Sequence, residues 1–207
     1  MQNQPPLLSK SRFMTGLQCH KALYLSCFER ELADPIGPAQ QAIFDTGTKI
    51  GEIARDICPG GTLIAEEYYE HPQSIKSTQK ILYDISVPAI YEAGFLYDDI
   101  RIRADILVMV DGNSYDLIEV KSTTKTKEEH ISDVAVQLYV LNGCGIAIRR
   151  ACLGHLNNKY VYQGGKYDLD QLFQIDDITI EAKDKQPEVE SQLRDMRAML
   201  GQSNPPD

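Results

Sequence analysis

The hydrophobic residues of the chain change their spacing near residue 89. Before this point, apolar residues recur every three or four positions, which predicts helices over residues 9–28, 40–57 and 72–85. Residues 62–67 have the pattern of a short strand between the last two helices. The second helix is expected to bury a stripe formed by Ile43, Ile50, Ala54 and Ile57.

From residue 89 onward, β-branched and aromatic residues dominate three consecutive segments. They predict strands over residues 89–97, 100–110 and 115–122. Asp98-Asp99 and residues 111–114 have the composition of tight turns between these strands. The three segments therefore predict an antiparallel meander.

The remaining chain alternates between helical and extended patterns. Residues 128–141 carry apolar side chains at three- and four-residue steps, which predicts a helix packed on the sheet. Two apolar runs follow at residues 146–156 and 160–162, and we expect them to extend the sheet as a hairpin. Residues 186–200 predict a polar helix. The expected fold class is therefore α/β, with a mixed central sheet flanked by helices.

Length and composition favour one main domain in a reducing compartment. The chain has 207 residues, and we place the domain at residues 1–180 and a C-terminal helix with its tail at residues 181–207. The N-terminus lacks the pattern of a secretory signal, and no apolar run is long enough to span a membrane. The five cysteines include no C-x-x-C pair, as is typical of reduced thiols. We therefore expect a cytoplasmic protein without membrane contact.

The acidic balance of the chain limits how it can bind nucleic acid. It has 21 lysines and arginines against 30 aspartates and glutamates, so its formal net charge is −9. This charge excludes a general attraction to polyanions, and any nucleic-acid contact must be local. Lys121, Lys125 and Lys127 lie among hydroxyl side chains in a patch suited to phosphate oxygens, although the same pattern fits a solvated loop.

Two carboxylates occupy neighbouring strands of the meander. If the loop between the strands consists of residues 111–113, Val110 pairs with Ser114, and Asp105 then lies opposite Glu119. A two-residue Asp-Gly turn would shift this register by one. The longer loop therefore predicts a pair of facing carboxylates.

Such a pair needs a cation. Carboxylates about 5 Å apart on an apolar sheet repel each other, and hard oxygen ligands suit Mg²⁺ or Mn²⁺. Lys121 lies on the same face as Glu119 because side chains alternate along a strand. It is therefore placed to orient a metal-bound water or a phosphate oxygen.

Asp105 followed by Glu119-Val120-Lys121 resembles the motif of the PD-(D/E)XK nuclease superfamily. The likeness is closer to its RecB-like branch, which includes the CRISPR-associated RecB-like exonucleases. Residues 8–13, 47–52 and 133–137 also carry this resemblance, and the order of the segments agrees over most of residues 8–180.

The resemblance implies a restriction-endonuclease-like fold and a nuclease that uses Mg²⁺ or Mn²⁺ to cut DNA, with single-stranded ends as the expected substrate. It implies that the metal is held by Asp105, Glu119, the Val120 carbonyl and Glu52. It gives Lys121 the nucleophilic water and Gln137 a contact to substrate or to the lysine. Taken alone, Glu52 fits an exposed helix carboxylate paired with Lys49 or Arg55.

Some features of the chain differ from the RecB-like pattern. The tyrosine usual four residues after the glutamine is Leu141 here, which leaves Tyr139 as a candidate for substrate binding or for the core. No cysteine follows Cys152, so we expect no iron–sulfur cluster. Similar domains precede a second domain in longer bacterial proteins, and the chain fits a truncated or a stand-alone version.

Two other functions remain open on this sequence. One is a catalytically inactive module that binds nucleic acid or a protein partner, and the other is hydrolysis of RNA or a small nucleotide-like molecule.

Overall fold

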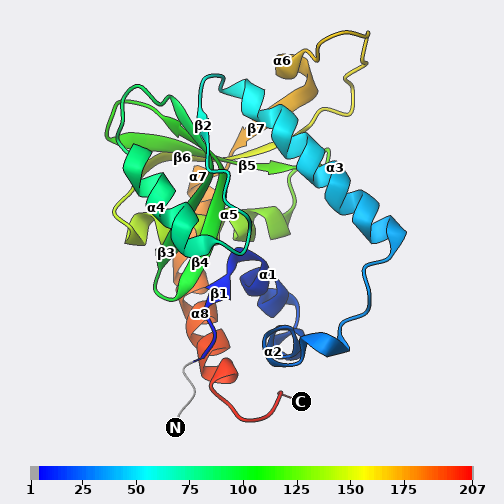
Figure 1. The fold of residues 1–207 in the computed structure, drawn as a ribbon, viewed down its shortest axis with the longest axis vertical. Helices are drawn as coiled ribbons and strands as arrows, with labels where there is room; N and C mark the ends of the chain where they lie inside the picture. The colour runs from blue at the N-terminus through cyan, green and yellow to red at the C-terminus, as the bar shows by residue number, and fades with distance from the viewer. Residues whose placement is uncertain (1–4, 207) are drawn as a thin grey trace.

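The computed structural model describes residues 5–206 and has an α/β fold built on a seven-stranded mixed sheet (Figure 1). Six strands follow the order β2-β3-β4-β5-β6-β7, and β1 pairs with β4 off this path. The strands are β1 (Leu8–Ser9), β2 (Thr62–Leu63), β3 (Ala89–Tyr97), β4 (Ile100–Met109), β5 (Ser114–Lys121), β6 (Ala147–Leu156) and β7 (Phe173–Asp177). The helices are α1 (Lys10–Gln18), α2 (His20–Phe28), α3 (Pro38–Ala54), α4 (His71–Ile81), α5 (Glu128–Gly143), α6 (Leu169–Leu172), α7 (Thr179–Asp184) and α8 (Gln186–Leu200).

The predicted meander is confirmed, as is the register of its second hairpin. β3, β4 and β5 are antiparallel neighbours. The Val110 N–H donates to the Ser114 carbonyl at 2.9 Å, so the loop has three residues, with Gly112 at a φ of +82° that suits glycine. The paired positions run from Met109 opposite Tyr115 to Ile106 opposite Ile118.

The predicted hairpin of residues 146–156 and 160–162 is wrong. Helix α5 crosses over between β5 and β6, so β6 runs parallel to β5. The other neighbour of β6 is β7, which pairs with it antiparallel, while residues 160–162 form no strand. The short apolar run at 160–162 therefore belongs to a long connection between β6 and α6 (Figure 1).

The N-terminal helices differ from their expected bounds. The helix predicted over 9–28 is two helices, because Cys19 is extended and its Sγ accepts the Ala22 N–H that starts α2. The helix predicted over 40–57 is α3, which starts earlier, and Ile43 on its expected buried stripe is 60% exposed. The N-terminal half of α3 extends away from the sheet in Figure 1, so this part of its apolar stripe has no element to pack on.

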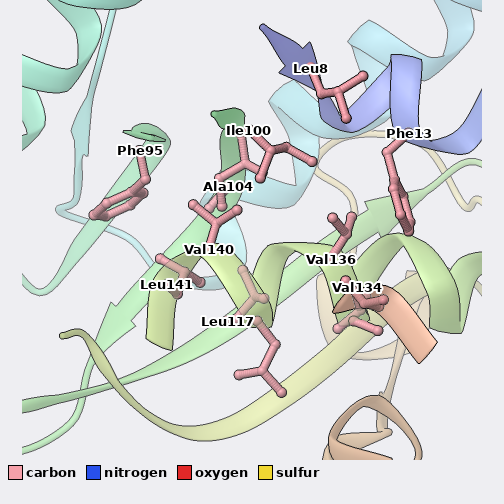
Figure 2. Packing of buried hydrophobic residues seen from close by; sticks show 14 of the residues in the cluster. Leu8, Phe13, Phe95, Ile100, Ala104, Leu117, Val134, Val136, Val140 and Leu141 are labelled. Carbon is pink, nitrogen blue, oxygen red and sulfur yellow. The ribbon is translucent and has the colours of Figure 1, made fainter. Parts of the chain in front are cut away.

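The sheet has an apolar core on each face. Figure 2 shows part of the larger core, with α5 against the sheet and β1 and α1 beside them; its labelled residues are Leu8, Phe13, Phe95, Ile100, Ala104, Leu117, Val134, Val136, Val140 and Leu141. Helix α8 adds Leu193 and Met196 to this core. On the other face, Ile106 and Ile118 pack with Ala54 of α3. The meander is therefore held between α5 and α3.

Within residues 5–206, no helix is both long enough and apolar enough to cross a membrane.

Candidate active site

The candidate site lies where β4 and β5 separate. Their pairing ends at Ile106 and Ile118, and the next position on β4 is Asp105. Its Oδ2 accepts the Val120 N–H at 2.8 Å, so a carboxylate replaces the main-chain partner that a continued ladder would supply. At the N-terminal end of β4, the neighbouring strand is β1 instead of β5, and Ser9 pairs with Arg101. Lys10 follows Ser9 directly as the first residue of α1, and its Nζ donates to Glu119 of β5.

A cavity of about 340 Å³ opens at this point. The sheet contributes carboxylates from three neighbouring strands, and α3 with the residue after it forms the facing wall. The lining residues are Gly47, Thr48, Gly51, Arg55, Glu92, Asp105, Glu119, Val120, Lys121 and Ser122. A Cβ added at Gly47 or Gly51 would meet no atom within 4 Å, so this part of the wall stands back from its neighbours.

Glu119 is fully engaged by cationic and amide donors. Its Oε1 accepts Lys10 Nζ at 2.8 Å and Lys121 Nζ at 2.7 Å, and its Oε2 accepts Gln137 Nε2 at 2.8 Å. Burial alone would raise the pKa of Glu119, but the two ammonium groups hold it well below its usual range. Glu119 is therefore an ionised carboxylate with a fixed orientation.

The two lysines share a second carboxylate, Asp133 of α5. Lys121 forms an ion pair with it, and Lys10 Nζ lies 3.7 Å from its Oδ1. Burial would lower the pKa of Lys121, but Glu119 and Asp133 hold it above its ordinary value. The same two carboxylates raise the pKa of Lys10 against the effect of burial, so both lysines stay protonated at neutral pH. We call these four residues the paired network: Lys10, Glu119, Lys121 and Asp133.

Asp105 has the opposite environment. It forms no ion pair within residues 5–206, and only the Val120 N–H donates to it. Burial, followed by repulsion from Glu119, raises the pKa of Asp105 to about 8. The charge of Lys10 offsets only part of this effect, so at neutral pH Asp105 holds a proton unless another cation replaces that proton.

Sequence reasoning missed the third carboxylate, Glu92. On β3 it lies between Tyr91 and Ala93, which pair with Ile106 and Ala104, so its position faces Asp105. Its φ of +57° is left-handed and interrupts the regular strand there. The expected two-residue turn at Asp98-Asp99 pairs Tyr97 with Ile100. Counting back along both strands from this pair, as was done for Asp105 and Glu119, would have placed Glu92 opposite Asp105.

Glu92 is held by two arginines. Arg103 Nε lies 3.4 Å and Arg55 NH2 lies 3.7 Å from its carboxylate oxygens. It also helps to raise the pKa of Asp105 after burial and Glu119. Glu92, Asp105 and Glu119 thus form a row of acidic positions across three strands.

The other predicted site residues divide between the site and the surface. Gln137 is fully buried and orients Glu119, so it lies behind the cavity rather than in contact with its contents. Glu52 is exposed and forms no ion pair within residues 5–206. It does not line the cavity, because α3 turns Gly47 and Gly51 toward the site instead. The structure does not bring Glu52 to Asp105 and Glu119.

Lys125, Lys127 and Tyr139 lie outside the cavity. Lys125 is exposed, whereas Lys127 caps α5 and lies 3.2 Å from Glu129. The Tyr139 hydroxyl donates to Asp98 Oδ2 at 2.7 Å, at the turn between β3 and β4. Tyr139 is therefore part of the packing around that turn.

The donor set fits a hard divalent cation in part. Among residues 5–206, no three His, Cys, Asp or Glu side chains converge closely enough to hold a metal by themselves. Mg²⁺, however, is often held by one or two carboxylates and completes its shell with water and substrate phosphate. Asp105 is half-buried and forms no ion pair within residues 5–206, and Glu119 and Val120 line the same cavity, so these residues would hold the ion.

Comparison of the sequence with models of known protein families found no match, and a search of curated proteins found no relative.

Proposed function

We propose that the chain is a metal-dependent nuclease of the PD-(D/E)XK superfamily with a restriction-endonuclease-like fold. Its proposed reaction is hydrolysis of DNA phosphodiester bonds with Mg²⁺ or Mn²⁺, acting as an exonuclease on single-stranded ends. One observation carries the proposal: Asp105, a half-buried carboxylate that forms no ion pair within residues 5–206, shares an open cavity with Glu119 and Lys121.

A bound divalent ion would lower the pKa of its water and offset the charge of a phosphate. Asp105 and Glu119 would hold that ion. The remaining residues prepare the site before substrate arrives, because Gln137 and Lys10 fix the Glu119 carboxylate from behind. Such fixed dipoles and charges need little reorganisation during the reaction.

Lys121 acts as a donor and not as a base. Its raised pKa keeps it protonated at neutral pH. An ammonium group has three N–H donors, of which two point to Glu119 and Asp133. The third is left for a phosphate oxygen, where it stabilises the negative charge that develops in the transition state.

A second candidate function is a binding module without catalysis. The observation that favours it is that the two carboxylate oxygens of Glu119 already accept three hydrogen bonds, which compete with a metal ion for these oxygens. A module of this kind would bind nucleic acid or a protein partner, and its binding would not depend on a metal.

A cleavage assay separates the two candidates. Labelled single-stranded DNA, double-stranded DNA and RNA are incubated with the protein in Mn²⁺ or in EDTA, beside Asp105→Asn, Lys121→Met and the matched control Lys125→Met. We expect cleavage only with Mn²⁺, unchanged in Lys125→Met and at least about a hundredfold slower in the other two variants.

Cleavage that persists in EDTA, or at equal rates in Asp105→Asn, would contradict the nuclease proposal. Binding that needs no metal and produces no cleavage would favour the module.

A further inference from the structure

A second, smaller cavity of about 150 Å³ lies on the other side of Lys10. Basic and hydroxyl side chains line it, and no carboxylate does. Its polar lining residues are Ser9, Lys10, Ser11, His71, Arg101 and Arg103. We call it the basic cavity and call the cavity around Asp105 the acidic cavity.

Arg101 is the unusual residue of the basic cavity. Its side chain forms no ion pair or hydrogen bond within residues 5–206, and its Nε is buried without a partner. Burial lowers the pKa of Arg101, and the nearby charges of Arg12 and Arg30 lower it further. A buried guanidinium N–H without an acceptor is costly, and such a group in a native fold calls for a ligand that satisfies it.

The nearby side chains of Arg12 and Arg30 cannot be that partner, because a guanidinium group has no hydrogen-bond acceptor. Arg12 donates to the Leu7 carbonyl at 2.9 Å, and Arg30 donates to the Ser26 carbonyl at 3.2 Å. Neither forms an ion pair within the described part of the chain. Several like charges therefore gather in a protein whose net charge is −9.

Two helices begin at this cavity. Lys10 is the first residue of α1 and His71 is the first residue of α4; the first turn of α1 holds no acidic residue, whereas Glu70 is the N-cap of α4. Burial, followed by Arg101 and Arg103, lowers the pKa of His71, so the ring stays neutral. The positive end of the α1 dipole adds to the guanidinium charge, and together they favour an anion.

Side chains that line the basic cavity form ion pairs with side chains that line the acidic cavity. Lys10 lines the basic cavity while its Nζ reaches Glu119, and Arg103 lines it while its Nε reaches Glu92. Arg101 and Arg103 are two residues apart on β4, which is about 7 Å along the strand. The two cavities therefore lie one side chain apart.

We infer that the basic cavity binds a phosphate group of a nucleic-acid strand, next to the phosphate that enters the acidic cavity. This inference rests on the proposed function, because it assigns the second phosphate of the same substrate. Arg101 offers planar N–H donors suited to phosphate oxygens, and the Ser9 and Ser11 hydroxyls lie at the cavity with their oxygens 3.0 Å apart.

The consequence is a fixed register for the strand. A phosphate bound at Arg101 determines which neighbouring phosphate of the nucleic-acid strand reaches Lys121. The bond that is cut would therefore lie at a fixed, short distance from the phosphate at Arg101. It also gives an acidic protein a local electrostatic contact for a polyanion.

The test measures binding without catalysis. Affinity for a fluorescent single-stranded oligonucleotide is measured by anisotropy in EDTA, with Arg101→Gln, Arg101→Lys and the control Lys183→Gln. Lys183 is an exposed cation on α7, a helix that packs on α5 and β6. We expect Arg101→Gln to weaken binding about tenfold and to reduce the salt dependence by about one ion, with Arg101→Lys intermediate and Lys183→Gln unchanged.

Two further arms define the ligand. Oligonucleotides with a 5′-phosphate, a 3′-phosphate or neither distinguish a terminal phosphate from an internal one, since preference for one end assigns the terminal group and equal affinities assign the internal diester. Inorganic phosphate at constant ionic strength is expected to raise the melting temperature of the wild type but not of Arg101→Gln.

The outcomes separate this inference from the nuclease proposal. Equal affinity and equal salt dependence of Arg101→Gln and wild type would overturn the phosphate site, even if the wild type cleaves DNA. Weakened binding by Arg101→Gln in a protein that cleaves nothing would support the phosphate site and overturn only the catalytic proposal. Thermal unfolding of each variant without ligand confirms that it folds, and Arg101→Lys retains the charge should Arg101→Gln unfold.

Discussion

The acidic and basic cavities are neighbours with opposite deficits of charge. In the acidic cavity, Asp105 lacks a cation, and in the basic cavity, Arg101 lacks an anion. Between them, the paired network satisfies every charge that it contains. Compensated buried charges fix geometry, whereas an uncompensated buried charge marks the place of a ligand.

The largest effect is expected when the paired network is broken. Glu119→Gln leaves Lys10 and Lys121 with Asp133 as their one remaining shared carboxylate, and removing one partner of a buried ion pair costs about 3 kcal/mol. The free energy of unfolding in urea measures this loss. The control Glu52→Gln, on an exposed residue, should change it by less than about 0.5 kcal/mol. Equal values for both variants would show that the network does not support the fold.

Removing the uncompensated carboxylate should have the opposite sign. Asp105→Asn is expected to stabilise the metal-free protein by about 1–2 kcal/mol at pH 9, because it deletes a half-buried charge that has no ion-pair partner within residues 5–206. At pH 4 the difference should be much smaller, since the folded wild type holds the proton and the unfolded chain is partly protonated as well. Urea unfolding at the two pH values tests this, and a destabilised Asp105→Asn at pH 9 would show that the charge is compensated.

The same carboxylate predicts a pH dependence. The pKa of Asp105 is about 8 in the folded state and about 4 when unfolded, so the folded state binds more protons between these values. The contribution of this group to stability is therefore complete below about pH 4 and is lost as the pH rises through about 8. Binding of a divalent ion at pH 7 should release a proton, which calorimetry in buffers of different ionisation enthalpy detects. Binding without proton release would place the ion elsewhere.

A smaller effect should follow from narrowing the acidic cavity. Gly51→Leu places a side chain in the open space beside the α3 wall. Because it also replaces a glycine within a helix, we expect the free energy of unfolding to rise by about 1 kcal/mol. Cleavage of DNA should nevertheless slow about tenfold, because substrate and side chain compete for the same space. Gly37→Ala, at the start of α3, serves as the control. Unchanged cleavage by Gly51→Leu would place the substrate away from this wall.

The smallest effect is expected at Tyr139. Tyr139→Phe removes the hydrogen bond to Asp98 and should cost about 0.5–1 kcal/mol of stability, with the cleavage rate unchanged. A stability curve and a cleavage assay on one preparation test both parts. A large loss of cleavage would return Tyr139 to the substrate-binding residues.

Local patterns predicted the meander and its register, which holds as far as Ile106 opposite Ile118, because strand alternation and loop length fix register. They did not predict that the pairing ends there, one position before Asp105 and Glu119. They did not predict Lys10 as the partner of Glu119, since the two residues are 109 positions apart and meet through the two-residue strand β1. The family resemblance placed Glu52 at the metal, whereas the residues alone favoured an exposed helix carboxylate, and Glu52 is exposed. The rotation of α3 against the sheet depends on packing, and each residue turns the helix by about 100°.

The basic cavity was also beyond sequence reasoning. The lysines at 125 and 127 looked like the phosphate contact because they are close in sequence to Lys121. The residues around Arg101 come instead from three distant segments, and the pairing of β1 with β4 brings two of them together. Clusters assembled by tertiary pairing leave no periodic signal in the chain.

Manganese binding followed by electron paramagnetic resonance tests the central claim most directly. Titration of the wild type, Asp105→Asn and Glu52→Gln with Mn²⁺ counts the ions that leave the free pool. The account predicts tight binding by the wild type and by Glu52→Gln, and its loss in Asp105→Asn. Equal binding by Asp105→Asn, or loss of binding in Glu52→Gln alone, would contradict it.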